Sequence, residues 1–569
     1  MIGAGWVTQV VPGLANFRGY PRTAVRGDVL GGLTVSAYLV PQALAYATLA
    51  GLAPVAGLWA ALPPLVIYAF LGSSRQLSIG PESTTALMTA AVLVPVVGAA
   101  DPGRYAAHAA TLALLVGVIC LVAGLLRLGF LANLLSRPVL VGYLSGIAAM
   151  MVASQLGRLT GVTVSGESII EQVRSFVTAV PELRWPTVAL SAAVLAVIFA
   201  LDSRAPRLPG PLIGILAATA AAALLAGSRN GGDMVDVVGA IPAGLPVPDW
   251  PAVSGDMLGD LVAPALGIAV VAFSDNVLTA RAFASRRGEE IDPHAELRAL
   301  GVCNLVAGMF RGFPISSSGS RTALADAAGA RTQVYSLVVL GVLATALVFG
   351  GGVMAAIPSA ALGALVVFAA TKLVDVAEFG RLARFRRSEL VIALATTAAV
   401  VVFGVLNGVL VAIGLSVADL LRRLAHAHDS VQGLVPGLPG MHDIDDYPAA
   451  TVVPGLLVYR YDAPLFFANA ADFRRRALAA IEDSPQPVRW FLLNAESNVE
   501  VDLTALDALE QLRTECERRG IVFAMARVKQ DLRDALAAAG LLDRIGPDRI
   551  FMTLPTAVAA YRQAHPDDG

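Results

Sequence analysis

The sequence predicts an α-helical membrane protein with many spans, followed by a small soluble α/β domain. Of its 569 residues, 56% are hydrophobic and 15% are charged, and the mean hydropathy is +0.69. Soluble domains contain about 25% charged residues, so this composition indicates an integral membrane protein. After Arg423 the composition changes, and short β-rich runs alternate with amphipathic stretches. That alternation is typical of an α/β domain.

The apolar part divides into 14 candidate spans. A helix needs about 20 residues to cross the hydrocarbon core, and some of these segments are shorter. Segments 78–98 and 318–328 open with Pro- and Ser-rich stretches, so we expect extended chain at their starts. The spans lie near residues 29–49, 54–71, 78–98, 106–126, 138–156, 187–202, 210–227, 258–280, 296–310, 318–328, 333–350, 352–371, 389–405 and 407–421.

Basic loops set the orientation, because short loops rich in arginine stay in the cytoplasm. Arginines precede the first span and follow or flank spans two, four, six, eight and twelve, whereas the loops between them hold aspartates. Both termini are therefore expected in the cytoplasm, with an even number of crossings and a multi-pass location in the inner (plasma) membrane. Residues 1–26 lack the pattern of a cleavable signal peptide and form a cytoplasmic segment.

The predicted domains are 1–26, a membrane domain at 27–425, a linker at 426–447 and a soluble domain at 448–569. The linker range is rich in glycine and proline. In the soluble domain, "GLLVYRYDA", "WFLLNAE", "IVFAMAR" and "RIFMTL" predict strands, and residues 473–481, 504–519 and 531–539 predict helices.

Two stretches repeat one pattern. "RQLSIGPESTTALMTAA" (75–91) and "RGFPISSSGSRTALADAAG" (311–329) each hold arginine, proline, a run of hydroxyl residues and Thr-Ala-Leu. They lie seven spans apart, so the two copies are inverted in the membrane. Paired, interrupted segments in inverted halves indicate the binding site of a secondary transporter. The alternative is ordinary loop chemistry near two span ends.

The first N–H groups of a helix that begins inside the membrane have no partner within the helix, and they attract an anion. Two such helices facing each other would form an anion site. Ser83 and Thr84 would add hydroxyl donors from one segment, and Ser318 and Ser320 from the other. Arg321 would add positive charge; its alternative is to extend toward the membrane interface.

Asp275 is the one charged residue within 261–280. A carboxylate near the middle of a span costs roughly 2.5–3.5 kcal/mol on insertion scales. Such a residue indicates function unless a neighbouring helix merely satisfies it. Glu82, beside the first broken segment, either faces the cytoplasm or pairs with Arg321, and the sequence leaves this open.

Several function classes are excluded. A phosphate-binding loop needs Gly-Lys-Ser/Thr, but neither lysine, Lys372 or Lys529, follows glycine. The six histidines and three cysteines show no metal spacing, no Gly-x-Ser-x-Gly occurs, and "HAH" falls in the linker. The net charge of −2 gives no sign of nucleic-acid binding. We expect no enzyme activity, no cofactor and no metal site of these types.

The motifs "GGLTVSAYLVPQALAYATLAGL", "GSSRQLSIGPES", "SDNVLTARAFA" and "GFPISSSGSRTA", with the C-terminal α/β domain, resemble the sulfate permease (SulP) family of anion transporters. The soluble part resembles the family's STAS domain. The resemblance implies a 14-span fold of two inverted seven-span repeats, divided into core and gate subdomains. It also implies elevator-like movement of the core and a homodimer in the lipid bilayer.

The resemblance also implies roles for residues. Gln42 would hydrogen-bond the anion, Tyr46 would line its pocket, and Ser320 and Arg321 match the family's serine-arginine pair. Many proton-coupled members have glutamate at the position of Asp275. Sodium-coupled bicarbonate members have aspartate followed by threonine, as in Asp275 and Thr279, which share one helix face. The coupling ion is therefore H⁺ or Na⁺, with H⁺ favoured.

These expectations favour proton-coupled sulfate uptake. The alternatives are sodium-coupled bicarbonate transport, and a membrane-anchored sensor or scaffold whose STAS domain is the output. In the tail, "VEVDLTALDAL" resembles the phosphorylation motif of anti-sigma antagonists, with Asp502 aligned and Leu503 at the serine position. Thr504 is a weak candidate for modification, and the other interpretation is a helix cap. We expect a structural or regulatory module.

Overall fold

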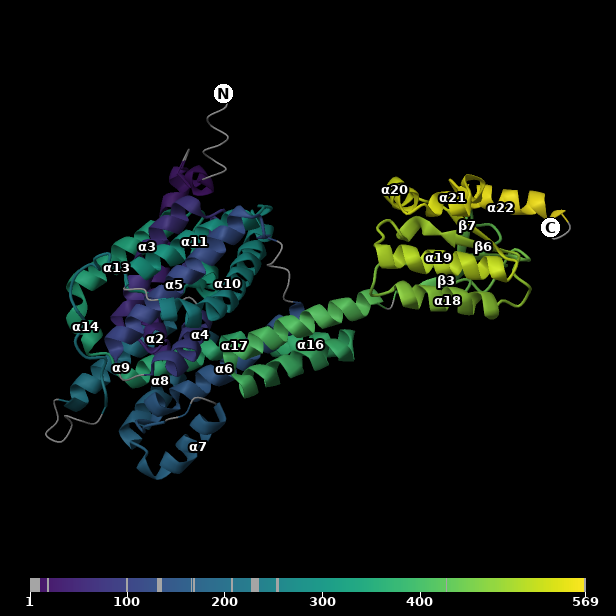
Figure 1. The fold of residues 1–569 in the computed structure, drawn as a ribbon. Coiled ribbons are helices and arrows are strands. Elements are labelled where there is room, and N and C mark those ends of the chain that lie inside the picture. Colours follow the sequence, from purple (N-terminus) through teal and green to yellow (C-terminus); the bar gives the residue numbers. More distant parts are fainter. Residues whose placement is uncertain are drawn as a thin grey trace. The chain divides into compact units, whose positions relative to one another are not determined.

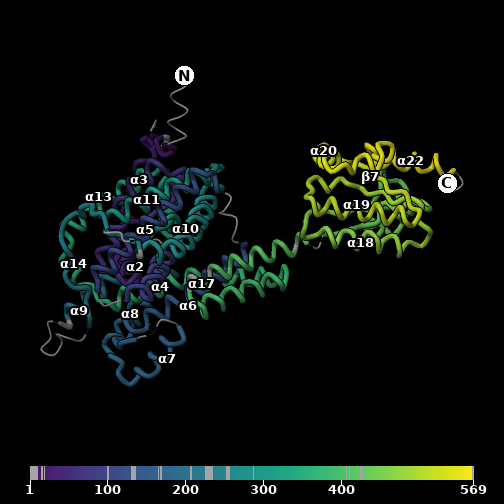
Figure 2. The backbone as a smooth tube through the Cα atoms, viewed as in Figure 1, coloured from purple at the N-terminus to yellow at the C-terminus, as the bar shows by residue number. Residues whose placement is uncertain are grey.

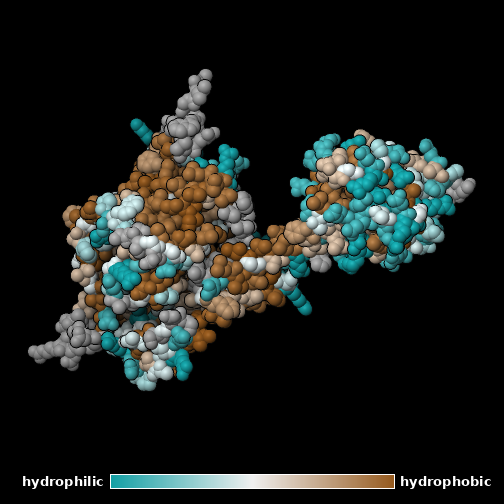
Figure 3. Space-filling view, in the orientation of Figure 1, coloured by the Kyte–Doolittle hydropathy of each residue, from teal (hydrophilic) through white to brown (hydrophobic). Residues whose placement is uncertain are grey.

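The structure is a computed structural model that describes residues 11–17, 20–98, 101–129, 136–164, 166, 169–205, 208–226, 235–251, 255–425 and 427–566. The chain divides into two compact units, Met1–Ser416 and Val417–Gly569, and each is described by itself (Figure 1). Hydrophobic residues cover much of the visible surface of the first unit, whereas hydrophilic residues predominate on the second (Figure 3). This contrast is what a membrane unit and a soluble domain require.

The first unit is a helical bundle, which Figure 2 traces as a tube. Its helices are α2 (Val25–Leu49), α3 (Val55–Leu71), α4 (Ser83–Val97), α5 (Pro102–Leu125), α6 (Arg137–Thr160), α7 (Ile169–Ala179), α8 (Trp185–Arg204), α9 (Gly210–Ala226), α10 (Gly255–Ala284), α11 (Pro293–Met309), α12 (Gly319–Ala327), α13 (Val334–Phe349), α14 (Gly351–Ala355), α15 (Ser359–Leu373), α16 (Val376–Phe385) and α17 (Arg387–Ala425), the last of which continues into the second unit.

The helices follow the 14 predicted segments in order. Within the described residues, seven helices are long and apolar enough to cross a membrane, and α3, α4, α9 and α13 are shorter apolar helices. The last two predicted segments form one helix, α17, which is interrupted at Gly404. There φ is 81° and ψ is 171°, a backbone conformation that favours glycine. Helices α7 and α16 were not predicted, because they are amphipathic rather than continuously apolar.

Small residues let the helices of the first unit approach closely. At Gly301 of α11 an added Cβ would lie 2.7 Å from the backbone nitrogen of Leu121 in α5. At Gly117 of α5 it would lie 2.7 Å from the backbone nitrogen of Leu305 in α11. Without apolar burial to drive association inside a membrane, such backbone proximity supplies the van der Waals contact that holds helices together.

The second unit is a six-stranded sheet with helices on both faces. The strand order is β4-β3-β5-β6-β7-β8, with β5 to β8 parallel and β3 antiparallel to both of its neighbours. Alternate strand residues face opposite sides, so Tyr459 packs with α18 and α19 while Val458 packs with α22. The elements are β3 (Asp429–Leu434), β4 (Met441–Asp443), β5 (Leu456–Tyr461), α18 (Ala470–Glu482), β6 (Trp490–Asn494), α19 (Leu503–Arg518), β7 (Val522–Ala526), α20 (Gln530–Ala538), α21 (Leu541–Ile545), β8 (Ile550–Phe551) and α22 (Leu554–Ala564).

The predicted linker at 426–447 differs from the structure. Strands β3 and β4 lie within it, and β3 pairs with β5 in the register Val431↔Tyr459. The glycines and prolines that suggested a linker form the turn between these strands, where Gly437 and Gly440 have positive φ. The folded domain therefore begins well before residue 448. His426 of the "HAH" sequence lies outside the described residues.

Candidate functional site

Two segments from opposite halves of the first unit break and pair with each other. Strand β1 (Ile79–Gly80) runs antiparallel to β2 (Ser316–Ser317), and the N–H of Ser318 donates to the carbonyl of Ser78 at 2.9 Å. Helix α4 begins directly after β1, and α12 directly after β2. This confirms the extended starts predicted from the Pro- and Ser-rich sequence. The pairing brings two helix amino ends together inside the bundle.

Buried side chains satisfy the backbone at these breaks. Asn304 of α11 accepts from the N–H of Ile315 at 2.9 Å and donates to its carbonyl at 3.1 Å. Gln333 donates to the carbonyls of Ser74 and Leu77, both at 3.0 Å. Irregular backbone at membrane depth is tolerated only where it is buried in protein and its polar groups have partners. The side-chain amides of Asn304 and Gln333 therefore supply hydrogen-bond partners to backbone groups that the two breaks would leave unsatisfied.

A cavity of about 610 Å³ lies at the two amino ends, and its lining comes from α2, α4, α6, α8, α10, β2, α12 and α15. Eight of the nine residues singled out from the sequence line it. They are Gln42, Tyr46, Ser83, Thr84, Asp275, Thr279, Ser318 and Ser320. The volume has ample space for a small oxyanion with some of its water.

Helix α2 contributes Gln42 and Tyr46, which lie one turn apart and therefore share a face. Their exposed fractions are 4% and 3%, so both reach solvent only through the cavity. The side-chain oxygen of Gln42 accepts from Nη1 of Arg321 at 3.4 Å. Because this contact uses the amide oxygen of Gln42, the amide nitrogen remains able to donate a hydrogen bond to a ligand.

Arg321 is the ninth residue, and it does not line the cavity. Its exposed fraction is 0%, so the interpretation that it extends to the membrane interface is wrong. The guanidinium donates from Nε to Ser78 Oγ at 3.2 Å and from Nη1 to the carbonyl of Pro81 at 3.0 Å. Its Nη2 has no hydrogen-bond partner in the described part of the chain. Arg321 thus places a positive charge within the wall where the two broken segments meet.

Of the two interpretations of Glu82 left open by the sequence, the structure does not bear out the ion pair with Arg321. Its Oε2 accepts from the N–H of Thr84 at 2.6 Å and its Oε1 accepts from Ser83 Oγ at 2.6 Å. The side chain lines the cavity, and no ion pair joins it to Arg321 within the described ranges. Glu82 therefore caps α4 with a carboxylate at the point where an anion was expected.

Asp275 faces the same cavity from α10, and its Oδ2 accepts from Ser317 Oγ at 3.4 Å. Thr279 lies one turn later on the same helix and also lines the cavity. The next residue, Asn276, donates to the buried carboxylate of Glu296 at 2.7 Å. That contact fixes the rotation of α10, which keeps Asp275 directed at the cavity.

The more exposed residues of the cavity lining were not predicted from the sequence. Lys372 of α15 pairs with Asp202 of α8 at 2.6 Å and lies 5.1 Å from the ring centroid of Phe368. All three side chains line the cavity, and those of Lys372 and Asp202 are 50% and 38% exposed. The available signal was composition, because Lys372 is one of two lysines in the chain.

The sulfate permease family model matches residues 25–396, and the STAS domain model matches residues 447–557. A probable sulfate transporter of Mycobacterium tuberculosis is 63% identical over 563 residues, which cover 99% of each chain. This chain belongs to the sulfate permease family. Sulfate transporter 4.1, chloroplastic, of Arabidopsis thaliana is 30% identical over 94% of this chain and 80% of its own.

Solved structures share the fold of this family member. The murine anion transporter Slc26a9 in its inward-facing state has a TM-score of 0.89 at 24% identity, over 99% of this chain and 95% of its own. The transmembrane domain of the cyanobacterial bicarbonate transporter BicA has a TM-score of 0.59 at 24% identity, over 70% and 98%. The protein is accordingly polytopic in the membrane, with the 14-span fold of two inverted repeats and a C-terminal STAS domain.

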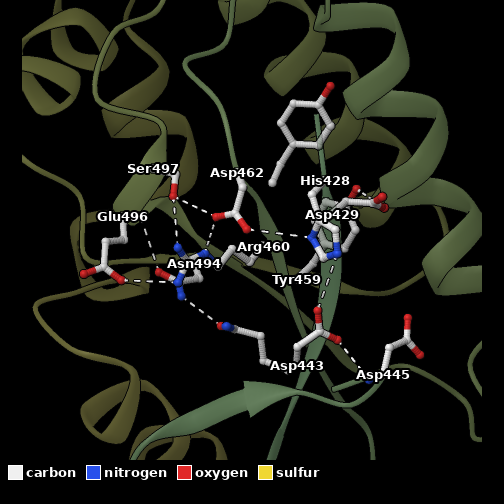
Figure 4. A network of polar contacts seen from close by, with 12 residues as sticks. His428, Asp429, Asp443, Asp445, Tyr459, Arg460, Asp462, Asn494, Glu496 and Ser497 are labelled. Atoms are coloured by element: carbon white, nitrogen blue, oxygen red, sulfur yellow. Dashed lines mark hydrogen bonds and ion pairs between the residues drawn. The ribbon is translucent and has the colours of Figure 1, made fainter. Parts of the chain in front are cut away.

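The STAS domain carries a network of charged and polar side chains (Figure 4). Arg460 Nε lies 2.5 Å from Asp462 Oδ1, and Ser497 Oγ donates to the same oxygen at 3.0 Å. His428 lies 3.8 Å from both Asp443 and Asp462. Asp443 and Asp462 thus each have a basic or hydroxyl partner. Burial, with the charge of Asp472, raises the pKa of nearby Tyr461 to about 12.

Asp502, the residue aligned with the phosphorylation motif, caps α19. Its Oδ1 accepts from the N–H of Ala505 at 2.8 Å and its Oδ2 from that of Phe467 at 2.7 Å. Leu503, at the serine position, is 72% exposed, and Thr504 is exposed beside it. The geometry thus fits the helix-cap interpretation of Asp502.

Proposed function

We propose that this family member is a secondary active transporter of an inorganic anion, most simply sulfate, driven by protons. The observation that carries the proposal is the pairing of β1 with β2, which sets the amino ends of α4 and α12 at one cavity that also receives Asp275. N–H groups and hydroxyls at such ends suit an oxyanion. The names of the M. tuberculosis and A. thaliana relatives support sulfate as the substrate.

In this proposal Gln42, Ser83, Thr84, Ser318 and Ser320 bind the anion, and Tyr46 bounds its site. Arg321 contributes its charge from within the wall rather than by contact. Selectivity for an oxyanion follows from many donors around a small cavity, because each oxygen of the anion then finds a partner.

Asp275 is proposed to carry the coupling proton. A carboxylate that faces a membrane cavity with one hydroxyl contact is costly when ionised, and protonation removes that cost. The proton would also offset charge on the anion during the crossing. One observation favours sodium as a second candidate: the side-chain oxygens of Asp275, Thr279 and Ser317 line the same cavity, and oxygen ligands suit a hard cation.

We further propose elevator-like movement of a core that holds α4 and α12, a homodimer, both termini in the cytoplasm and a plasma-membrane location. The STAS domain would then serve assembly or regulation. The competing class is a membrane-anchored sensor in which the cavity transports nothing.

Uptake of labelled sulfate into proteoliposomes containing the full chain tests the proposal. An inward proton gradient should drive accumulation of sulfate, Asp275→Asn should abolish it, and Asp260→Asn should leave it unchanged. Asp260 is an exposed acid on the same helix and so serves as the matched control. Sodium-driven uptake of bicarbonate without sulfate would replace this proposal by its alternative. No uptake of any anion would favour the sensor.

A further inference from the structure

The two broken helices have different caps, although their sequences share a pattern. Helix α12 is capped by the hydroxyl of Ser318, which accepts from the N–H of Arg321 at 3.5 Å. Helix α4 is capped by the carboxylate of Glu82, which takes both the N–H of Thr84 and the hydroxyl of Ser83 at 2.6 Å. One amino end therefore presents a neutral group to the cavity and the other a tethered anion.

The donors held by Glu82 are those that the proposed substrate needs. A carboxylate and a substrate oxyanion are both acceptors, so they compete for the same N–H and O–H groups. Ionised Glu82 also repels an anion electrostatically, and the second acid of the cavity, Asp275, adds to that repulsion. A dianion such as sulfate is therefore opposed by two negative groups unless these bind protons.

We propose that Glu82 is a proton-operated competitor that decides when the α4 end of the site accepts an anion. Ionised Glu82 occupies the Thr84 N–H and the Ser83 hydroxyl. A proton from the side to which the cavity opens neutralises the carboxylate, weakens its hold on both donors and lets the anion take them. After the core has moved and the anion has left on the other side of the membrane, Glu82 releases its proton there and recaps α4. The inference rests on the proposed function and adds a second protonation site to it.

Charged and titratable groups surround Glu82 on the other elements. Tyr46 of α2, Tyr143 of α6, Asp275 of α10 and Arg321 of α12 all interact with it electrostatically. The ion pair of Asp202 with Lys372 lies in the more exposed part of the same lining. Arginine and tyrosine keep one charge state over the physiological pH range, so Asp275 is the acid whose titration must be separated from that of Glu82.

Two observations distinguish Glu82 from an ordinary cap. It lines a cavity that also holds an acid, whereas an ordinary carboxylate cap faces water. The buried guanidinium nearby gives its Nη1 to the carbonyl of Pro81, the residue before Glu82, and has Nη2 without a partner among the described residues. A positive charge in the wall thus stays available to an anion that replaces the carboxylate.

The test measures sulfate binding to the full chain in lipid nanodiscs between about pH 5.5 and pH 8. Glu82→Gln should bind sulfate about tenfold more tightly than the natural protein at the upper pH and should lose about one proton from the pH dependence of log Kd. Glu82→Asp keeps a titratable cap and should keep the pH dependence. Glu182→Gln, at an exposed acid far along the chain, is the control. Glu82→Gln and Glu82→Asp, each combined with Asp275→Asn, isolate the proton that Glu82 binds from any proton bound by Asp275.

The outcomes separate this inference from the proposed function. Binding by the natural protein with an equal pH slope in Glu82→Gln would overturn the role of Glu82 and leave the anion site in place. Absence of sulfate binding to the natural protein at every pH would overturn the proposed function itself. If Glu82→Gln fails to fold, the slope of Glu82→Asp decides, because loss of pH dependence there contradicts the inference.

Discussion

Two acids of the membrane cavity, Glu82 and Asp275, differ in their surroundings from the acids of the STAS domain, whereas the third cavity acid, Asp202, pairs with Lys372. In the STAS domain, Asp429 accepts from Tyr459 at 2.8 Å and pairs with Arg476 at 2.5 Å. Glu510 pairs with Arg513 and Arg544, each at 2.8 Å. In the cavity, Glu82 and Asp275 contact hydroxyls and one N–H, with no ion pair in the described part of the chain.

The difference separates acids that stabilise the fold from acids that we expect to take part in binding or transport. A paired, partly exposed acid contributes to stability, and removing its partner costs free energy. An unpaired acid inside a membrane protein costs free energy, so its presence points to a proton, an ion or a substrate. The same contrast applies to the cations, because Arg321 contacts neutral oxygens whereas Arg476 contacts carboxylates.

The largest expected effect comes from removing the unpaired cation. Arg321→Met should weaken sulfate binding by roughly 30-fold or more, because a buried guanidinium without an ionic partner attracts a dianion in surroundings of low dielectric. The melting temperature should change little, because the buried oxygens of Ser78, Pro81 and Gln42 lose their donor while the cost of burying a charge without an ionic partner is removed. Equilibrium binding and thermal unfolding in the same detergent measure both quantities.

Arg381→Met, at an exposed arginine of α16, is the matched control and should change neither quantity. A large fall in melting temperature for Arg321→Met with unchanged affinity would place Arg321 among the structural charges. Arg321 would then resemble the paired arginines of the STAS domain, and the contrast between the two regions would not extend to positively charged residues.

The next effect concerns a paired acid. Asp429→Asn should destabilise the STAS domain locally by about 1.5 kcal/mol, because Arg476 loses one of its two carboxylate partners and Tyr459 loses a charged acceptor. Sulfate uptake per folded protein should stay unchanged. Hydrogen exchange of β5 and α18 in the full chain measures the local stability. Reduced uptake with normal exchange protection would show that paired acids also serve transport.

The smallest effect concerns Glu510. Hydrogen bonding from Arg513 lowers the pKa of Glu510 below its ordinary value of 4.5. Its stabilising contribution is therefore present above about pH 4.5 and lost as the pH falls through the lowered pKa. The side chain is 26% exposed, so the contribution is at most about 1 kcal/mol. Glu510→Gln should remove this acid-sensitive part from the hydrogen-exchange stability of α19, and an unchanged pH profile would contradict the assignment.

Much of the fold followed from the sequence because its signals are local. Apolar length predicted the spans, and the prolines and serines before α4 and α12 predicted two extended starts. The linker prediction failed because glycine and proline mark both linkers and hairpin turns, and the short strands on either side carry little apolar signal. Pairing of a β3 strand with β5 is a long-range contact that composition does not encode.

The site was predictable in its residue types but not in its contacts. Hydroxyls and an acid on broken segments indicated the cavity lining, and eight of the nine named residues line it. The burial of Arg321 could not be predicted, because an arginine near the start of a segment can either extend to the membrane interface or lie buried in the wall of a cavity. The carboxylate cap on α4 was hidden as well, because the direction of Glu82 depends on the backbone turn at Gly80 and Pro81.

The most direct test of the central claim is the position of a bound anion. Selenate has the shape and charge of sulfate and scatters anomalously, so a crystal of the full chain with selenate locates it without ambiguity. The account predicts one anomalous peak in the cavity between the first turns of α4 and α12, with Ser83 and Ser318 in hydrogen-bonding reach and Glu82 turned away from Thr84. A peak elsewhere in the bundle, with Glu82 still capping α4, would contradict it.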